Sequence, residues 1–80
     1  MMETFEILLN RYLMDEYIEG CIAGLIYIAT GTPDDYGYIY SEDGPVATMR
    51  FDATKDQVRT VVECINKLRP EVYAGVKVAE

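Results

Sequence analysis

The sequence predicts an α+β fold, a two-layer sandwich of order α-β-β-β-α-β, in which both helices cover one face of a mixed four-stranded sheet. Two observations support this prediction. Apolar side chains recur at helical spacing in two segments, one near the N-terminus and one between residues 54 and 69. The remaining segments are β-branched, or alternate apolar with polar side chains, as strands do. The 80 residues predict a single domain, 1–80.

The first part of the chain is predicted to form a helix and then a buried strand. Residues 3–18 place apolar side chains three and four positions apart, and Gly20 would end the helix. This stripe consists of Phe5, Leu8, Leu9, Tyr12, Leu13 and Tyr17. Residues 21–30 are apolar on both sides and lie between Gly20 and Gly31, which favours a central strand.

A hairpin is predicted to follow. Residues 36–41 and 46–52 have strand character, and the turn between them contains Asp43-Gly44, a strong hairpin signal. These segments would form the second and third strands.

A helix and a last strand complete the predicted fold. Thr54 and Gln57 have the spacing of a capping box, and Pro70 prevents the helix from continuing. Residues 72–78 alternate as a strand with one buried face does. The third strand, this helix and the fourth strand would form a parallel βαβ unit with a right-handed crossover.

Strand alternation predicts a tyrosine-rich sheet face that no helix covers. The predicted core set is Ile22, Ile26, Ile28, Ile39, Met49, Phe51, Val72, Val76 and Val78. The predicted open-face set is Leu25, Tyr27, Tyr36, Tyr38, Tyr40, Thr48, Arg50, Tyr73 and Lys77. Tyrosine is enriched at protein interfaces, but aromatic pairs also stabilise a sheet without any partner, so both interpretations stay open. A β-bulge would reverse the assignment of faces.

The charge of the chain is negative and unevenly distributed. Its formal net charge is −7, from 14 Asp and Glu against seven Lys and Arg. Residues 1–49 contribute a net charge of −8, with Arg11 as their one base, and residues 50–80 contribute +1. Such a chain repels nucleic acid and anionic lipid and attracts basic surfaces.

Acidic side chains are predicted to gather at two opposite edges of the sheet. The first edge would collect Asp15, Glu16, Glu19, Glu42 and Asp43, and the second Asp34, Asp35 and Asp52. The edges would lie about 20 Å apart, beyond the screening length of ~8 Å, so two distinct patches could imitate the phosphates of a nucleic acid. The alternative is that acids occupy loop tips because they favour turns and solubility.

The residue types argue against catalysis. The chain has no His to activate a Ser or Cys nucleophile, and Cys21 and Cys64 form no Cys-x-x-Cys pair. We expect no enzyme activity, no cofactor and no metal. The start of the chain lacks a signal-peptide pattern, and its longest apolar run has nine residues, so we expect a cytoplasmic protein without a membrane span.

No segment carries a signature specific to a family, so function is predicted by class. We expect a small acidic module that binds a basic protein or nucleoprotein complex, without direct nucleic-acid or membrane contact. It would be an inhibitor that occludes a basic nucleic-acid-binding surface, as phage anti-CRISPR, other anti-defence and nuclease immunity proteins do. The alternative is a structural or regulatory module that homodimerises through its tyrosine-rich face. The candidate partner-binding residues are Asp15, Glu16, Glu19, Tyr36, Tyr38, Tyr40, Glu42 and Asp43.

Overall fold

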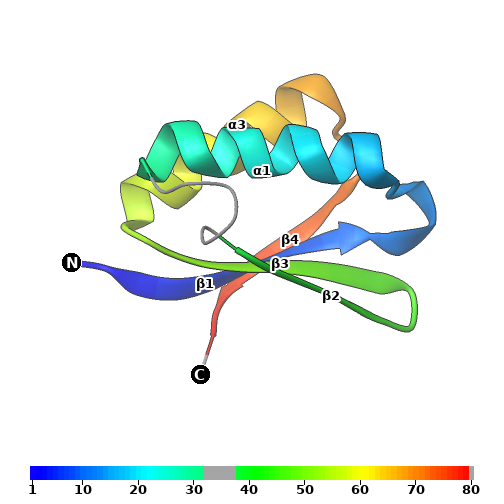
Figure 1. The fold of residues 1–80 in the computed structure, drawn as a ribbon, viewed down its shortest axis with the longest axis horizontal. Coiled ribbons are helices and arrows are strands. Elements are labelled where there is room, and N and C mark those ends of the chain that lie inside the picture. Colours follow the sequence, from blue (N-terminus) through cyan, green and yellow to red (C-terminus); the bar gives the residue numbers. More distant parts are fainter. Residues whose placement is uncertain (32–37, 80) are drawn as a thin grey trace.

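Two helices pack against each other on one face of a four-stranded sheet in the computed structural model, which describes residues 1–31 and 38–79 (Figure 1). This arrangement confirms the predicted two-layer α+β class. In chain order the elements are β1 (Glu3–Asn10), a short 3₁₀ helix η1 (Arg11–Leu13), α1 (Glu16–Thr30), β2 (Ile39–Asp43), β3 (Val46–Ala53), α3 (Lys55–Leu68) and β4 (Tyr73–Val78).

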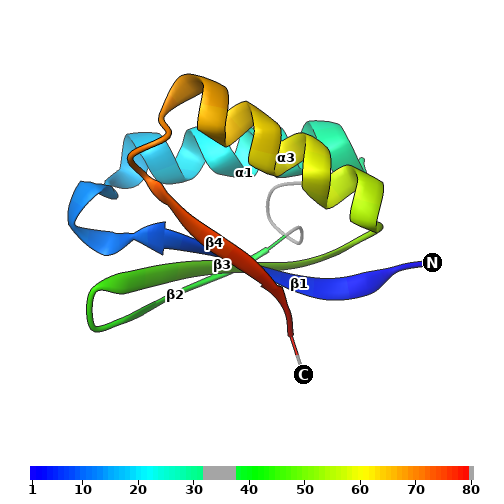
Figure 2. The ribbon, with the colours of Figure 1, turned by 180° about the vertical axis from the view of Figure 1, so that it is seen from behind.

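The sheet has the strand order β2-β3-β1-β4, and every neighbouring pair is antiparallel (Figure 2). The prediction of a mixed sheet is therefore wrong. The predicted βαβ unit of β3, α3 and β4 is present in split form, because β3 and β4 both run antiparallel to β1, and so parallel to each other, but β1 lies between them. Likewise β3 lies between β1 and β2, so each half of the chain contributes a strand to the middle of the sheet. This β-α-β-β-α-β connectivity is that of the ferredoxin-like, or split βαβ, arrangement.

The N-terminal segment is a strand and not the predicted helix. Phe5, Ile7 and Leu9 alternate along β1 and are buried beneath the helices, while Leu8 points to the open face. The helical spacing of the prediction combined side chains from both faces of this strand. Backbone hydrogen bonds stabilise β1 on both sides, because it pairs with β3 along one edge and with β4 along the other.

The next segment is a helix and not the predicted strand. The Asp15 carboxylate caps α1 by accepting a hydrogen bond of 2.8 Å from the amide of Ile18. Gly31 ends the helix in the left-handed conformation, with φ 75°, and its amide donates to the Tyr27 carbonyl at 2.7 Å. The order α-β-β-β-α-β is thus corrected to β-α-β-β-α-β.

The second half follows the prediction closely. The hairpin connects β2 and β3 through Gly44, which has a positive φ of 61°. The Thr54 hydroxyl accepts from the Gln57 amide, and the Gln57 side chain accepts from the Thr54 amide, so the capping box is confirmed. The last strand is confirmed too, with a register shift opposite Leu8 and Leu9.

The core lies between the inner face of the sheet and the helices. Its buried residues are Phe5, Ile7, Leu9, Ile18, Ile22, Ala23, Ile26, Ala47, Met49, Phe51, Ala53, Val58, Val61, Ile65 and Val72. Of the predicted core set, Ile22, Ile26, Met49, Phe51 and Val72 are confirmed. The others are exposed, because Ile28 lies on the outer side of α1, Ile39 lies on the open face of the sheet, and Val76 and Val78 lie on an edge strand.

Candidate functional site

One end of the sheet brings together the acidic residues of the first predicted edge. Asn10, the last residue of β1, pairs with Val46, the first residue of β3, so the chain leaves β1 beside the hairpin turn. There the Arg11 amide donates to the Pro45 carbonyl at 3.1 Å, and the Arg11 guanidinium donates to the Gly44 carbonyl at 3.0 Å. These bonds hold the start of α1 close to the hairpin. We call Asp15, Glu16, Glu19, Glu42 and Asp43 the acidic end.

Three of these acids lie at the N-terminus of α1. Asp15 is the N-cap, and Glu16 and Glu19 stand in the first turn. Carboxylates are favourable there because the first amides of a helix are unpaired and the helix dipole is positive at this end. Helix capping therefore accounts for part of the negative charge at this site.

Two tyrosines orient carboxylates at the acidic end. The Tyr38 hydroxyl donates to Oε2 of Glu19 at 2.9 Å, and the Tyr40 hydroxyl donates to Oε2 of Glu42 at 3.1 Å. Burial, the hydrogen bond to Glu42 and the charges of Glu42 and Glu19 raise the pKa of Tyr40 to about 12. Both carboxylates thus act on the same phenol, which shows that α1 and the hairpin present their acids side by side.

Two arginines lie near these acids. Nε of Arg11 is 3.7 Å from Oε2 of Glu42, with both side chains more than two-fifths exposed. Arg69, just after α3, forms a 2.5 Å ion pair with Glu71, and this hydrogen bond raises the pKa of Arg69 and lowers that of Glu71. The charge of Asp15 also raises the pKa of Arg69, so the end of α3 lies at the same end of the molecule.

The predicted tyrosine-rich open face is wrong. Tyr40 pairs with the buried Met49 and therefore faces the helices, and Tyr38 packs against the same core. Tyr73 also packs against the core, and burial raises the pKa of its hydroxyl. Tyr27 lies on α1. The open face of β1 and β3 instead carries Thr4, Glu6, Leu8, Asn10, Val46, Thr48, Arg50 and Asp52.

The second predicted acidic edge is described only in part. Asp34, Asp35 and Tyr36 lie outside the described residues. Asp52 is described, and its carboxylate accepts a 2.5 Å hydrogen bond from the Thr4 hydroxyl across the β1–β3 pair. The Asp52 side chain thus has a structural partner within the sheet.

The sequence-based prediction missed an apolar stripe on the outer side of α1. It consists of Tyr17, Gly20, Cys21, Gly24, Tyr27 and Ile28, at spacings of three and four residues. We call it the α1 stripe. Ile28 is 82% exposed, and no charged residue occurs between Gly20 and Thr30. That absence of charge is visible in the sequence, but an uncharged apolar run is equally typical of a buried strand.

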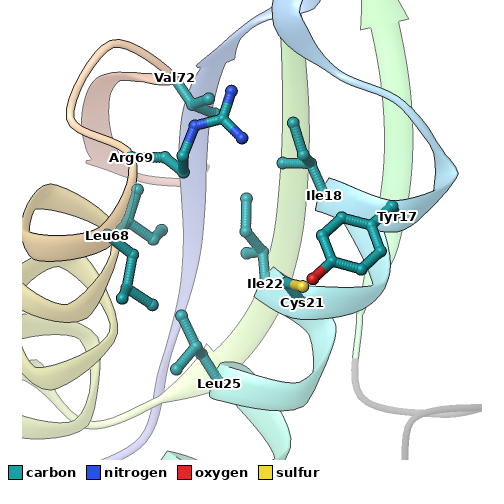
Figure 3. A pocket seen from close by; sticks show the side chains of 9 residues that line it. Tyr17, Ile18, Cys21, Ile22, Leu25, Leu68, Arg69 and Val72 are labelled. Atoms are coloured by element: carbon teal, nitrogen blue, oxygen red, sulfur yellow. The ribbon is translucent and has the colours of Figure 1, made fainter.

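A cavity of about 300 Å³ opens between α1 and the end of α3, next to the α1 stripe. Figure 3 shows apolar side chains from both helices around it, with the Arg69 guanidinium at one side. Its lining residues are Tyr17, Ile18, Cys21, Ile22, Leu25, Ile65, Leu68, Arg69 and Val72.

Within residues 1–31 and 38–79, no group of three or more Cys, Asp or Glu side chains is arranged to hold a metal ion. In the same described part of the chain, no helix has the length and apolar character that crossing a membrane requires. No protein-family model matches the chain, and no curated protein or solved structure matches it either.

Proposed function

We propose that the protein is a partner-binding module whose acidic end docks on a basic, nucleic-acid-binding surface of another protein and inhibits that protein. The observation that supports this proposal is the arrangement of the acidic end. Five carboxylates come together there from α1 and the hairpin, and tyrosine hydroxyls orient two of them, Glu19 and Glu42.

Orientation of the carboxylates favours binding. A side chain that is already held in place loses less conformational entropy when it meets a partner. Each carboxylate offers about four acceptor sites and uses one for its tyrosine, so it can still accept hydrogen bonds from a partner arginine. The negative charge of the acidic end would also accelerate the encounter with a basic surface, more strongly at low salt.

An affinity capture from cell lysate, with the protein as bait at low and moderate salt, tests this proposal. We expect retention of a basic nucleic-acid-binding protein that elutes as salt rises. The test variant is Glu16→Lys, Glu19→Lys and Asp43→Lys, which leaves the N-cap Asp15 in place. Its matched control is Glu3→Lys, Glu6→Lys and Glu63→Lys. Each triple variant replaces three negative charges by three positive ones and so takes the formal net charge from −7 to −1.

The two variants separate a defined site from general attraction. We expect the acidic-end variant to release the partner at lower salt and the control to retain it. Short duplex DNA should compete with the protein for the purified partner, because both would occupy one surface. Equal loss of binding in both variants, or a partner that binds duplex DNA and this protein together, would refute the proposal.

A second candidate function is self-association, now through the α1 stripe. Ile28 is 82% exposed, and a Cβ at Gly20 or Gly24 would meet nothing within 4 Å, so the chain's own packing does not require these glycines. The stripe also lacks charge, so two copies of this acidic chain could approach there without strong repulsion.

Sedimentation velocity over a dilution series tests this second candidate. Ile28→Lys should abolish a dimer that Ile39→Lys leaves intact, because Ile39 is exposed on the open face of the sheet. A monomer at every concentration, or equal effects of the two substitutions, would exclude the α1 stripe as a dimer interface.

A further inference from the structure

The strand β2 has one side without a neighbouring strand. It is the first strand in the order β2-β3-β1-β4 and pairs only with β3. The Asn10 amide donates to the Val72 carbonyl at 2.8 Å, so the backbone of Asn10 faces away from β3, and that of its β3 partner Val46 faces β2. Bonded residues alternate along an antiparallel ladder. The backbone groups of Tyr40 and Glu42 therefore face outward, away from β3.

This outer side of β2, which we call the β2 edge, is unoccupied within the described part of the chain. No residue of 1–31 or 38–79 hydrogen-bonds to the outward backbone groups of Tyr40 and Glu42. The side chains of β2 are exposed too, apart from the half-buried Tyr40. An unpaired edge of this kind is a template for another strand.

The side chains along the β2 edge divide between the two faces of the sheet. Tyr40 and Glu42 lie on the helix side, because their β3 partners Met49 and Ala47 are buried. Ile39 lies on the open side, where it is 66% exposed. A strand added beside β2 would keep this alternation, so every second side chain would face the helix side.

The helix side of the β2 edge is acidic. Figures 1 and 2 show α1 on the β2 side of the molecule and α3 on the β4 side. The Tyr38 hydroxyl bonds Glu19 at 2.9 Å, so the side of α1 that carries Glu19 faces β2, and Glu16 lies one turn earlier on that side. Glu42 adds a carboxylate from β2 itself. Arg11 lies 3.7 Å from Glu42, but both side chains are exposed, and such a pair is weak.

We propose that the β2 edge binds an extended basic segment of another protein, which adds a fifth strand antiparallel to β2. Residues of the segment opposite Tyr40 and Glu42 would bond to their outward backbone groups and direct their own side chains to the helix side. Lys or Arg at these positions would meet Glu16, Glu19 and Glu42. The residues between them would lie on the open side, where an apolar one would cover Ile39. This inference rests on the proposed function, because it uses the acidic end, and it specifies the form of the basic partner.

The charges distinguish this partner from other occupants. A second copy that paired β2 with β2 would bring two sets of Glu16, Glu19 and Glu42 together, and like charges oppose that contact. A nucleic acid has no peptide groups to continue the ladder, and the net charge of −7 repels it. A basic segment satisfies both the backbone edge and the carboxylates.

Two synthetic peptides of the same composition test the alternation. One has the sequence Ser-Arg-Val-Arg-Val-Arg-Ser with blocked ends, and the other has Ser-Arg-Arg-Arg-Val-Val-Ser. Fluorescence anisotropy measures binding to the protein, and amide hydrogen exchange followed by NMR locates it. We expect the alternating peptide to bind more tightly and to slow exchange at the amides of Tyr40 and Glu42. The amides of β4, the other edge strand, should be unaffected.

Methylation of peptide amides separates strand pairing from charge. In the proposed pairing the Arg amides donate to β2, whereas the Val amides face solvent. N-methylation of two Arg residues of the alternating peptide should weaken binding roughly tenfold or more. N-methylation of its two Val residues should change binding by less than about twofold, because those amides have no partner in the complex. Both methylated peptides keep every charge.

Charge variants of the protein test the carboxylates. Glu19→Gln with Glu42→Gln should weaken binding of the alternating peptide roughly tenfold. Glu3→Gln with Glu63→Gln makes the same change in net charge away from the β2 edge and should have a smaller effect.

The outcomes separate the added strand from the proposed function. Binding that Glu19→Gln with Glu42→Gln weakens, but that N-methylation of Arg does not, would overturn the added strand and leave the acidic end as a docking surface. Equal effects of the two protein variants would count against both. Equal binding of the two unmethylated peptides, slowed exchange at β4 instead of β2, or no binding at millimolar peptide would each overturn the added strand, while the lysate capture still decides the proposed function. Protection of the Tyr40 and Glu42 amides that grows with protein concentration alone would overturn it too, because the occupant would then be another copy of the chain.

Discussion

Tyr40 belongs to both the core and the acidic end. It faces the helices opposite the buried Met49, while its hydroxyl reaches out to the Glu42 carboxylate at 3.1 Å. Tyr38 does the same for Glu19 at 2.9 Å. Side-chain alternation along this strand puts either Ile39 or the two tyrosines on the core face, and the more aliphatic choice, Ile39, is the wrong one. Tyr38 and Tyr40 are predicted from the sequence to contact a partner. In the structure they instead orient the Glu19 and Glu42 carboxylates, which are proposed to make that contact.

The titration of Tyr40 tests this arrangement. Its pKa in the folded state is raised to about 12, whereas that of an unfolded tyrosine is about 10. The folded state thus favours the neutral phenol, and its contribution to stability is full below pH 10 and is lost as the pH rises through 12. Residue-resolved carbon NMR of the tyrosine rings measures the pKa.

A neutralising variant separates the causes of this shift. Glu42→Gln removes one charge near the phenol and should lower the Tyr40 pKa, though not to its ordinary value, because burial is the largest cause. Glu63→Gln, on the exposed side of α3, should leave it unchanged. A folded-state pKa near 10 in the unaltered protein would show that the hydroxyl does not bond Glu42.

At the scale of elements, the sequence predicted the second half of the chain and exchanged strand for helix in the first half. Asp43-Gly44 and the Thr54 capping box are local signals with one structural meaning, and both are confirmed. The run 21–30 is apolar all round, and periodicity cannot distinguish a buried strand from a buried helix in such a run. The caps do distinguish them, because Asp15 and Gly31 enclose 15 residues, too many for an ordinary strand.

Two glycines of α1 should respond to the same substitution with opposite signs. Gly24 lies inside the helix, and an added Cβ would meet nothing within 4 Å. Gly24→Ala should therefore raise the free energy of unfolding by roughly 0.5–1 kcal/mol. Gly31 has a φ of 75°, which strains any other residue, so Gly31→Ala should lower it by about 1 kcal/mol.

Urea denaturation of the two variants, followed by circular dichroism, checks both signs. The measurement belongs at low protein concentration, so that self-association through the α1 stripe does not contribute to stability. Destabilisation by Gly24→Ala would mean that the helix packs more closely there than the structure indicates.

At the scale of the whole molecule, the topology explains why the acidic end was predicted from partly wrong elements. The prediction placed Asp15, Glu16 and Glu19 at the end of a helix over residues 3–18, whereas the structure places them at the start of α1. In both arrangements this part of the chain lies beside the hairpin. The sequence could not show how β1 divides the sheet, because the partner of a strand depends on the whole core.

The crowding of like charges at one end should make stability depend on salt. A formal net charge of −7 opposes the compact state, and salt screens this repulsion, so the urea midpoint should rise between 0.05 and 0.5 M NaCl, across which the screening length falls by roughly threefold. Glu16→Gln, Glu19→Gln and Asp43→Asn remove three charges from the acidic end. Glu3→Gln, Glu6→Gln and Glu63→Gln remove three charges from elsewhere. If the acidic end is the main source of repulsion, the first variant should flatten the salt dependence more than the second, whereas equal slopes would show that its carboxylates are too well solvated to repel one another.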